Sequence, residues 1–223
     1  MKVLQISFLI LAAIIGLLPA AEFSCFFKPD GWSRQDWLPV KTPRWDEAGG
    51  WQQNGDHLQN RIPEGMTDEQ LVSCHETYVS MLWKEPIEGN AVISSTMSFD
   101  DRYAPGIVLS GELASRETAS GAMAEYREHW EIVLYADGLN VWHHEFVDGK
   151  PFWRLAAWLK HPFAAREKHR LSAKVEFGAK GPMLTVTCDD QTFGCLIPAF
   201  PKIYRAGIMA CEGLNRFYDF QVK

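Results

Sequence analysis

Hydrophobic and polar residues alternate with a period of two along most of this chain, and this alternation constrains the fold more than any other feature. It is clearest between Tyr126 and Tyr135. One parity of this segment consists of Tyr126, Glu128, Trp130, Ile132 and Leu134, and the other consists of Arg127, His129, Glu131, Val133 and Tyr135. Such alternation is typical of a β-strand with one face on a core and the other facing solvent or a cleft. We therefore predict a strand whose second face carries polar side chains.

Similar short segments, separated by Gly, Pro, Asn and Asp, follow one another after residue 50, and no stretch keeps a helical period over three turns. Closely spaced strands of this kind indicate an all-β fold of two packed sheets. Met66–Leu71 is expected to form one short helical turn, and Leu113–Ala124 a loop or short helix. The predicted strands are Gly50–Gln53, Leu58–Asn60, Tyr78–Lys84, Ala91–Phe99, Gly106–Glu112, Tyr126–Tyr135, Asn140–Phe146, Trp153–Leu159, His169–Phe177, Met183–Cys188, Ala206–Cys211 and Asn215–Val222.

The first residues have the pattern of a secretory signal. Lys2 precedes an apolar stretch from Phe8 to Leu18, and Ala20 and Ala21 are small residues suited to a cleavage site. The apolar stretch is shorter than the roughly 20 residues of a spanning helix. We predict a signal peptide at residues 1–20, a single β-sandwich domain at 21–223, and a secreted or periplasmic protein without stable membrane insertion.

The charge of the chain argues against a nucleic-acid partner. The formal net charge is −6, and removal of Lys2 with the signal leaves −7. No basic block of five or more residues occurs. Binding to a polyanion requires such clusters of Lys and Arg, so nucleic acid is not an expected partner.

The five cysteines suggest disulfides in an exported protein. Cys188 and Cys195 flank a predicted hairpin tip, where a bridge is geometrically reasonable. Cys25 with Cys74 is a second candidate pair. Cys211 would then be the odd thiol, and we expect it to be a small buried residue.

The candidate site lies on one face of three predicted strands joined by the turns Ala136–Gly138 and Asp148–Pro151. If Trp130, Ile132 and Leu134 point into the core, the opposite face of their strand is polar. On the next two strands we expect the same face to present Asn140, Trp142 and His144, then Arg154 and Trp158. The predicted face therefore consists of Arg127, His129, Glu131, Tyr135, Asn140, Trp142, His144, Arg154 and Trp158.

These residue types suit sugar recognition. An aromatic plate covers the apolar face of a sugar ring, while fixed donors and acceptors bind its hydroxyl groups. We assign substrate-binding roles to Arg127, Asn140, Trp142, Arg154 and Trp158, and catalytic roles to Glu131, His129, His144 and Tyr135. The alternative is a solvated strand face on which His and Glu have no chemical role.

Several motifs resemble one known family. They are Gly50–Leu58, the Glu125-Tyr126 strand, Gly207-Ile208, and the closing segment Leu214–Val222. Over almost the whole mature chain they resemble the concanavalin A-like lectin/glucanase superfamily, and within it the bacterial 3-keto-disaccharide hydrolase domain, a laminin-G-like jelly roll. The resemblance implies an antiparallel two-sheet jelly-roll sandwich with a concave sheet on which relatives bind or cleave polysaccharides.

The resemblance leaves three functions open, because the family includes glycosidases, uronate lyases and modules that only bind. A glycosidase needs two carboxylates about 5 to 9 Å apart. Glu125 and Glu131 share a parity but would be roughly 20 Å apart in a strand, so the glucanase pair is absent. A lyase needs a cation, a base and an acid, which Arg127 or Arg154, His129 or His144, and Tyr135 would supply.

No metal motif is recognisable. His143 and His144 face opposite ways in a strand, and neither His-x-His nor Cys-x-x-Cys occurs. We expect no metal ligands and no cofactor, although relatives often carry a structural calcium ion and the resemblance allows one. The predicted function is therefore a secreted carbohydrate-active protein that acts on a glycosidic bond of an oligo- or polysaccharide; a non-catalytic carbohydrate-binding or surface-interaction module and a uronate lyase are the alternatives.

Overall fold

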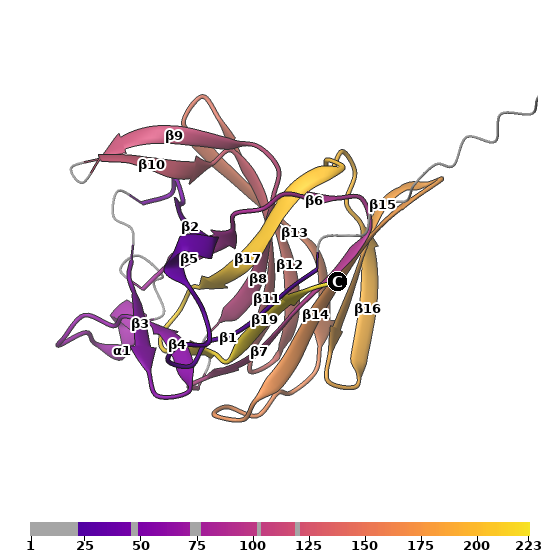
Figure 1. Ribbon diagram of the computed structural model, residues 1–223. Helices are drawn as coiled ribbons and strands as arrows, with labels where there is room; N and C mark the ends of the chain where they lie inside the picture. Colours follow the sequence, from indigo (N-terminus) through magenta and orange to yellow (C-terminus); the bar gives the residue numbers. More distant parts are fainter. Residues whose placement is uncertain (1–21, 46–48, 72–76, 102–103, 119–120) are drawn as a thin grey trace, which may run out of the picture.

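Two large β-sheets pack face to face (Figure 1). The computed structural model describes residues 22–45, 49–71, 77–101, 104–118 and 121–223. The predicted signal peptide and Cys74 lie outside these ranges. In the described part of the chain, no helix has the length and apolarity needed to span a membrane.

The first sheet has nine strands, with the order β16-β15-β14-β7-β18-β4-β3, and β19 pairs with both β7 and β1. Its strands are β1 (Phe23–Phe26), β3 (Trp51–Asn54), β4 (His57–Asn60), β7 (Ala91–Phe99), β14 (His169–Gly178), β15 (Gly181–Cys188), β16 (Gln191–Leu196), β18 (Asn215–Phe217) and β19 (Asp219–Val222).

The second sheet has ten strands, with the order β13-β12-β11-β8-β17-β5-β2-β10-β9, and β6 pairs with β17. All of its described pairs are antiparallel except β2 with β10. Its strands are β2 (Trp37–Lys41), β5 (Val79–Trp83), β6 (Ile87–Glu88), β8 (Pro105–Ser110), β9 (Leu113–Thr118), β10 (Gly121–Tyr126), β11 (Glu128–Tyr135), β12 (Gly138–Val147), β13 (Lys150–Lys160) and β17 (Ile203–Ala210). Two short helices, η1 (Arg34–Asp36) and α1 (Asp68–Leu71), lie in the connections.

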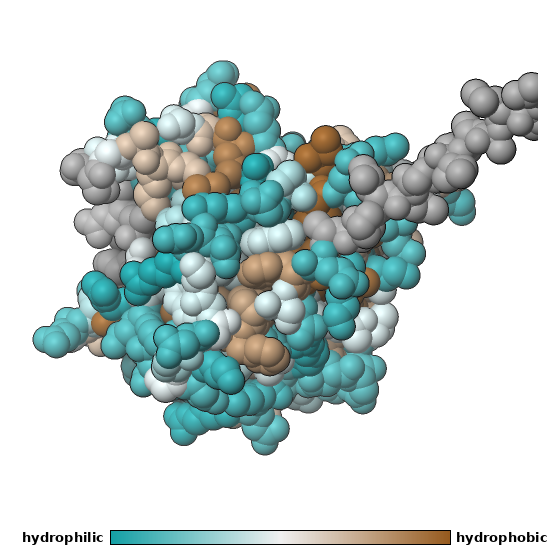
Figure 2. Space-filling view, in the orientation of Figure 1, coloured by the Kyte–Doolittle hydropathy of each residue, from teal (hydrophilic) through white to brown (hydrophobic). Residues whose placement is uncertain are grey.

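The core between the sheets is built by the alternation seen in the sequence. Trp130, Ile132 and Leu134 of β11 are buried on one side of it, and alternate residues of β14, such as Leu171 and Val175, are buried on the other. Removal of these side chains from water is the main stabilising term of the sandwich. The outer surface in Figure 2 is mostly hydrophilic, with smaller hydrophobic patches between the polar residues.

The predicted all-β sandwich is confirmed, as is the helical turn at Met66–Leu71, where α1 lies. The prediction of a loop or short helix at Leu113–Ala124 is wrong, because this segment belongs to the hairpin of β9 and β10. Its Ala, Ser and Glu residues have weak strand propensity, but pairing with β2 extends the sheet across it. Strands β1, β2, β6 and β16 were not predicted from the sequence.

The predicted bridge between Cys188 and Cys195 is also wrong. Both thiols are free, and the β15–β16 register pairs Cys188 with Gln191 and Cys195 with Leu184. The two cysteines are therefore four residues out of register, about 13 Å along the strand, beyond the reach of a disulfide. Cys25 is a free, buried thiol, and its proposed partner Cys74 lies outside the described residues. Cys211 is buried, as expected.

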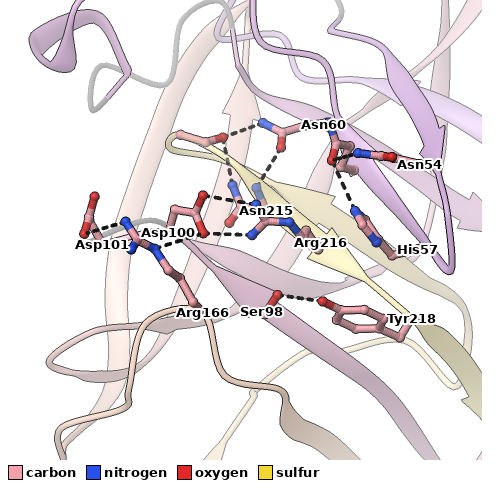
Figure 3. A network of polar contacts seen from close by, with 12 residues as sticks. Asn54, His57, Asn60, Ser98, Asp100, Asp101, Arg166, Asn215, Arg216 and Tyr218 are labelled. Atoms are coloured by element: carbon pink, nitrogen blue, oxygen red, sulfur yellow. Dashed lines mark hydrogen bonds and ion pairs between the residues drawn. The ribbon is translucent and has the colours of Figure 1, made fainter.

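Two buried asparagines fix the loop that enters β18 (Figure 3). Asn60 Nδ2 donates to the carbonyl oxygens of Gly213 at 2.6 Å and Thr77 at 3.2 Å, and its Oδ1 accepts from the backbone N–H of Asn215 at 2.9 Å. The Asn215 side chain in turn donates to the Glu212 carbonyl oxygen at 2.7 Å. Buried amides that satisfy backbone groups in this way hold residues 212–215 in one conformation.

Beside this loop, Arg216 and Asp100 form a bidentate ion pair with distances of 2.8 and 3.1 Å (Figure 3). The hydrogen bonds from Arg216 hold the pKa of Asp100 below its ordinary value of 3.8. A depressed carboxyl pKa stabilises the fold above the pKa of the unfolded chain, and that contribution is lost as pH falls through the folded pKa.

We therefore expect Asp100→Asn to lower the free energy of unfolding by about 1 to 2 kcal/mol at pH 7. Urea denaturation from pH 7 to pH 2.5 measures this, and the curves of variant and wild type should converge at the acidic end. A difference that stays constant with pH would show that the charge of Asp100 is not the cause.

Candidate functional site

A buried polar cluster lies on the face of the ten-stranded sheet that points away from the core. The hairpin turn between β11 and β12 pairs His129 with His144 and Glu131 with Trp142. Their side chains share the face opposite Trp130 and Ile132, as predicted from parity. His129, Glu131 and His144 are only 1%, 4% and 2% exposed, so this part of the face is not a solvated strand surface.

Glu131 is the centre of the cluster. Its Oε1 accepts a hydrogen bond from the Tyr78 hydroxyl at 2.9 Å and lies 3.0 Å from His129 Nε2. Its Oε2 lies 3.2 Å from His144 Nε2, although the angles of that contact are not those of a hydrogen bond. The two imidazole rings are nearly parallel, with centroids 4.6 Å apart, and Tyr126 stacks on His129 at 4.2 Å.

Burial and neighbouring groups set the protonation states. Burial lowers the pKa of His129 to about 4, despite the opposing effect of Glu131, so its imidazole is neutral at pH 7. Burial acts to raise the pKa of Glu131, but the nearby His144 and the hydrogen bond with His129 outweigh it and hold the pKa well below its ordinary value. Burial, together with the charge of Glu131, raises the pKa of Tyr78. The cluster therefore contains a carboxylate that accepts hydrogen bonds from the Tyr78 hydroxyl and from a neutral His129.

A pocket of about 340 Å³ opens above this cluster. Five of the predicted site residues line it: Glu131, Tyr135, Asn140, Trp142 and His144. Arg44, Trp153 and Glu212 complete its polar and aromatic lining, with Ala104, Val133 and Cys211 between them. Aromatic walls and a few converging polar groups are typical of a site for a small molecule or one unit of a polymer.

The third strand does not present the residues that strict alternation predicts. A register shift opposite Val141 and Trp142 leaves Ala156 of β13 unpaired, which reverses the parity along the strand. Trp153 therefore pairs with His144 and faces the pocket, whereas Arg154 pairs with His143 on the other side and its Nε donates to His143 Nδ1 at 3.2 Å. The predicted place of Arg154 in the site is wrong.

Trp158 does lie on the predicted face, because it is beyond the bulge and pairs with Asn140. It is 60% exposed and does not line the pocket. Its predicted role in substrate binding is untested, but its place outside the pocket argues against that role.

Arg127 is also not where the sequence placed it. The chain bends there between β10 and β11, so the parity changes and Tyr126, rather than Arg127, lies beside His129. The Arg127 guanidinium is exposed, lies 3.6 Å from Glu112, and lines a separate pocket with Trp130 and Phe200.

Three functional candidates come from distant parts of the sequence and were missed. Arg44 lies over the rings of Trp45 and Trp153, with its Cζ 4.3 and 5.1 Å from their centroids. Tyr78 immediately precedes β5, and Glu212 lies in the loop fixed by Asn60. No periodicity or spacing in the sequence pointed to any of the three, because each lies in a different segment of the chain.

Several solved structures have a similar fold. The carbohydrate-binding module CBM66 from Bacillus subtilis is 13% identical, with a TM-score of 0.56 over 84% of this chain and 95% of that one. An endo-β-galactosidase from Clostridium perfringens that releases GlcNAcα1-4Gal is 9% identical, with a TM-score of 0.58 over 91% of this chain and 62% of that one. Lectin II from Ulex europaeus is 9% identical, with a TM-score of 0.54 over 91% and 97%. The fold is the concanavalin A-like jelly roll.

The concanavalin A-like fold confirms the architecture that the resemblance in the sequence implied. No family model and no curated protein matches the chain. The narrower likeness to the 3-keto-disaccharide hydrolase domain stays a prediction. With identities of 9 to 13%, these neighbours establish the architecture, and the functional argument depends on the pocket itself.

Proposed function

We propose that this chain binds a saccharide in the pocket on the outer face of the ten-stranded sheet. The observation that carries the proposal is the convergence of Trp142 and Trp153 with Asn140, Tyr135 and Arg44 around one opening of about 340 Å³. Indole rings cover the apolar face of a sugar, and the amide, phenol and guanidinium groups hydrogen-bond to its hydroxyls. The neighbours with this fold include a carbohydrate-binding module, a lectin and an endo-β-galactosidase, which supports the choice of ligand.

Arg44 gives the pocket a rigid edge. Its guanidinium lies against two indole rings, which restricts the side chain before any ligand arrives. Preorganisation of this kind reduces the entropy lost on binding. The predicted export of the protein agrees with this function, because polysaccharides are abundant outside the cell, and export remains part of the proposal.

Trp153→Ala tests the proposal most directly. We expect it to weaken binding of a recognised oligosaccharide by roughly 10- to 100-fold, because the Trp153 ring is 53% exposed in the free protein and a bound sugar would cover it, and aromatic contacts buried on binding dominate affinity. Titration calorimetry, after a screen of a polysaccharide panel by affinity electrophoresis, measures the change.

Trp158→Ala is the matched control, because it removes the same side chain from the same strand outside the pocket. It should change affinity less than threefold. Equal losses in both variants, or no binding to any member of a panel of neutral and acidic polysaccharides, would contradict the assignment of the pocket.

Cleavage of a glycosidic bond is a second candidate, favoured by one observation. Glu131 and Glu212 both line the pocket, and a hydrolase needs two carboxylates that face one bond. The low pKa of Glu131 suits a base or nucleophile, which leaves Glu212 as the acid. His144 and Tyr135, the base and acid of the lyase alternative, line the same pocket.

The catalytic alternatives are separated by their products. Hydrolysis releases reducing sugar, and elimination from a uronate produces absorbance near 232 nm. If Glu212→Gln abolishes reducing-sugar release while oligosaccharide affinity persists, hydrolysis is supported. Binding with neither product leaves saccharide recognition as the function.

A further inference from the structure

The cluster below the pocket leaves several polar atoms unsatisfied. Among the described residues, His129 Nδ1 and both ring nitrogens of His144 have no hydrogen-bond partner. Each side chain is at least 97% buried. A buried polar atom without a partner is destabilising, and native structures seldom keep several together unless a ligand satisfies them.

The donor atoms of the cluster are close enough together to share one cation. One atom each of His129, Glu131 and His144 lie within 4.8 Å of one another. The Nε2 to carboxylate-oxygen distances are 3.0 and 3.2 Å. Two ligand atoms that each lie about 2.0 to 2.1 Å from a tetrahedral ion are about 3.3 Å from one another. The two nitrogen–oxygen distances are therefore close to the ligand–ligand distance of a tetrahedral site. The 3.2 Å contact between His144 Nε2 and Glu131 Oε2 does not have the angles of a hydrogen bond. Such a geometry is expected when both atoms point toward a shared ion rather than toward each other.

The chemistry of the set identifies the class of ion. Two imidazoles and a carboxylate suit zinc and related divalent transition metals, whereas calcium prefers six to eight oxygen ligands. The Tyr78 hydroxyl orients the carboxylate in the way that outer groups of metal centres do.

We propose that His129, Glu131 and His144 bind one divalent transition-metal ion of the zinc class at the floor of the pocket, with its remaining coordination position open to that pocket. The two rings are parallel within 10°, so one imidazole turns about its Cβ–Cγ bond, a torsion with broad preferences, to share the ion with the other. Because the ligands come from two strands, the absence of a local metal motif in the sequence does not conflict with this site. The site is tested without any saccharide and does not depend on the proposed function.

The experiment starts from the full-length protein stripped with a chelator. Titration with Zn²⁺, followed by elemental analysis after dialysis, should give one ion per chain with submicromolar affinity, and Co²⁺ should produce visible d–d absorption. Ca²⁺ at the same concentration should not bind this site. Zn²⁺ should also raise the melting temperature, since an ion that binds only the folded state stabilises it.

Glu131→Gln and His144→Gln should each weaken Zn²⁺ binding by roughly 100-fold or more. His143→Gln is the matched control, because His143 is the next residue, is equally buried and contacts a carboxylate, Glu128, on the other side of the sheet. Circular dichroism verifies that each variant folds.

No bound Zn²⁺ in the wild type would overturn the proposal. So would binding that survives both site variants, or binding that His143→Gln abolishes equally. If Glu131→Gln fails to fold, His144→Gln and the Co²⁺ spectrum of the wild type decide the question on their own.

Discussion

Replacing Glu131 with leucine is expected to lower the free energy of unfolding by about 3 to 5 kcal/mol, because it removes the shared partner of three buried groups. Leucine fills a similar volume but accepts no hydrogen bond. The Tyr78 hydroxyl and the His129 imidazole would then remain buried without an acceptor. Urea denaturation at pH 7 in the presence of a chelator measures the loss without any contribution from a metal.

Glu128→Leu is the control for this substitution. Glu128 also contacts a buried histidine, with His143 Nε2 at 2.6 Å, but its side chain is 45% exposed. Water replaces much of what the carboxylate contributes there, so we expect a change of about 1 kcal/mol or less. If Glu131→Leu proves as mild as Glu128→Leu, the polar cluster is not holding the β11–β12 region together.

Gly207→Ala is expected to destabilise the fold by about 3 kcal/mol or more. Gly207 of β17 pairs with Leu82 of β5, and a Cβ atom at this position would overlap the carbonyl oxygen of Met81 and lie 2.7 Å from Leu82 Cα. Both obstacles are backbone atoms of the neighbouring strand, which cannot rotate away as a side chain can. The two strands would have to separate, and overpacking of this kind is destabilising.

Gly178→Ala is the matched control, since Gly178 lies near the end of β14 and its added Cβ would meet nothing closer than 4.0 Å. There the methyl group restricts the unfolded chain and should be neutral or stabilising by about 0.5 kcal/mol. Thermal and urea unfolding of the two variants compare them directly. Similar stabilities would show that β17 and β5 are not as closely apposed as the structure has them.

The site could be predicted from sequence wherever a strand keeps strict alternation around a short turn. Glu131, Tyr135, Asn140, Trp142 and His144 line one pocket because the turn at Ala136 and Asp137 fixes the register of β11 and β12. In such a hairpin, parity and turn length determine which side chains share a face.

The prediction failed where one residue interrupts that rule. The unpaired Ala156 brings Trp153 into the pocket and removes Arg154 from it. The bend at Arg127 places Tyr126, rather than Arg127, beside His129. Neither Ala156 nor Arg127 differs in type from ordinary strand residues. The position of a bulge depends on how β13 fits against β12, which the local sequence does not encode.

The sequence by itself determined the all-β class, the core-facing residues and the polar face of one hairpin, because these depend on periodicity along a single stretch of chain. Only the tertiary structure decided what that face can do. Tyr78, Arg44 and Glu212 reach the pocket from segments far apart in sequence, and burial beneath them converts Glu131 and its two histidines from strand surface into a cluster of potential ligands. Proximity of this kind depends on how the strands are ordered in the sheet, and protonation depends on the resulting burial, so neither could be inferred before the fold was known.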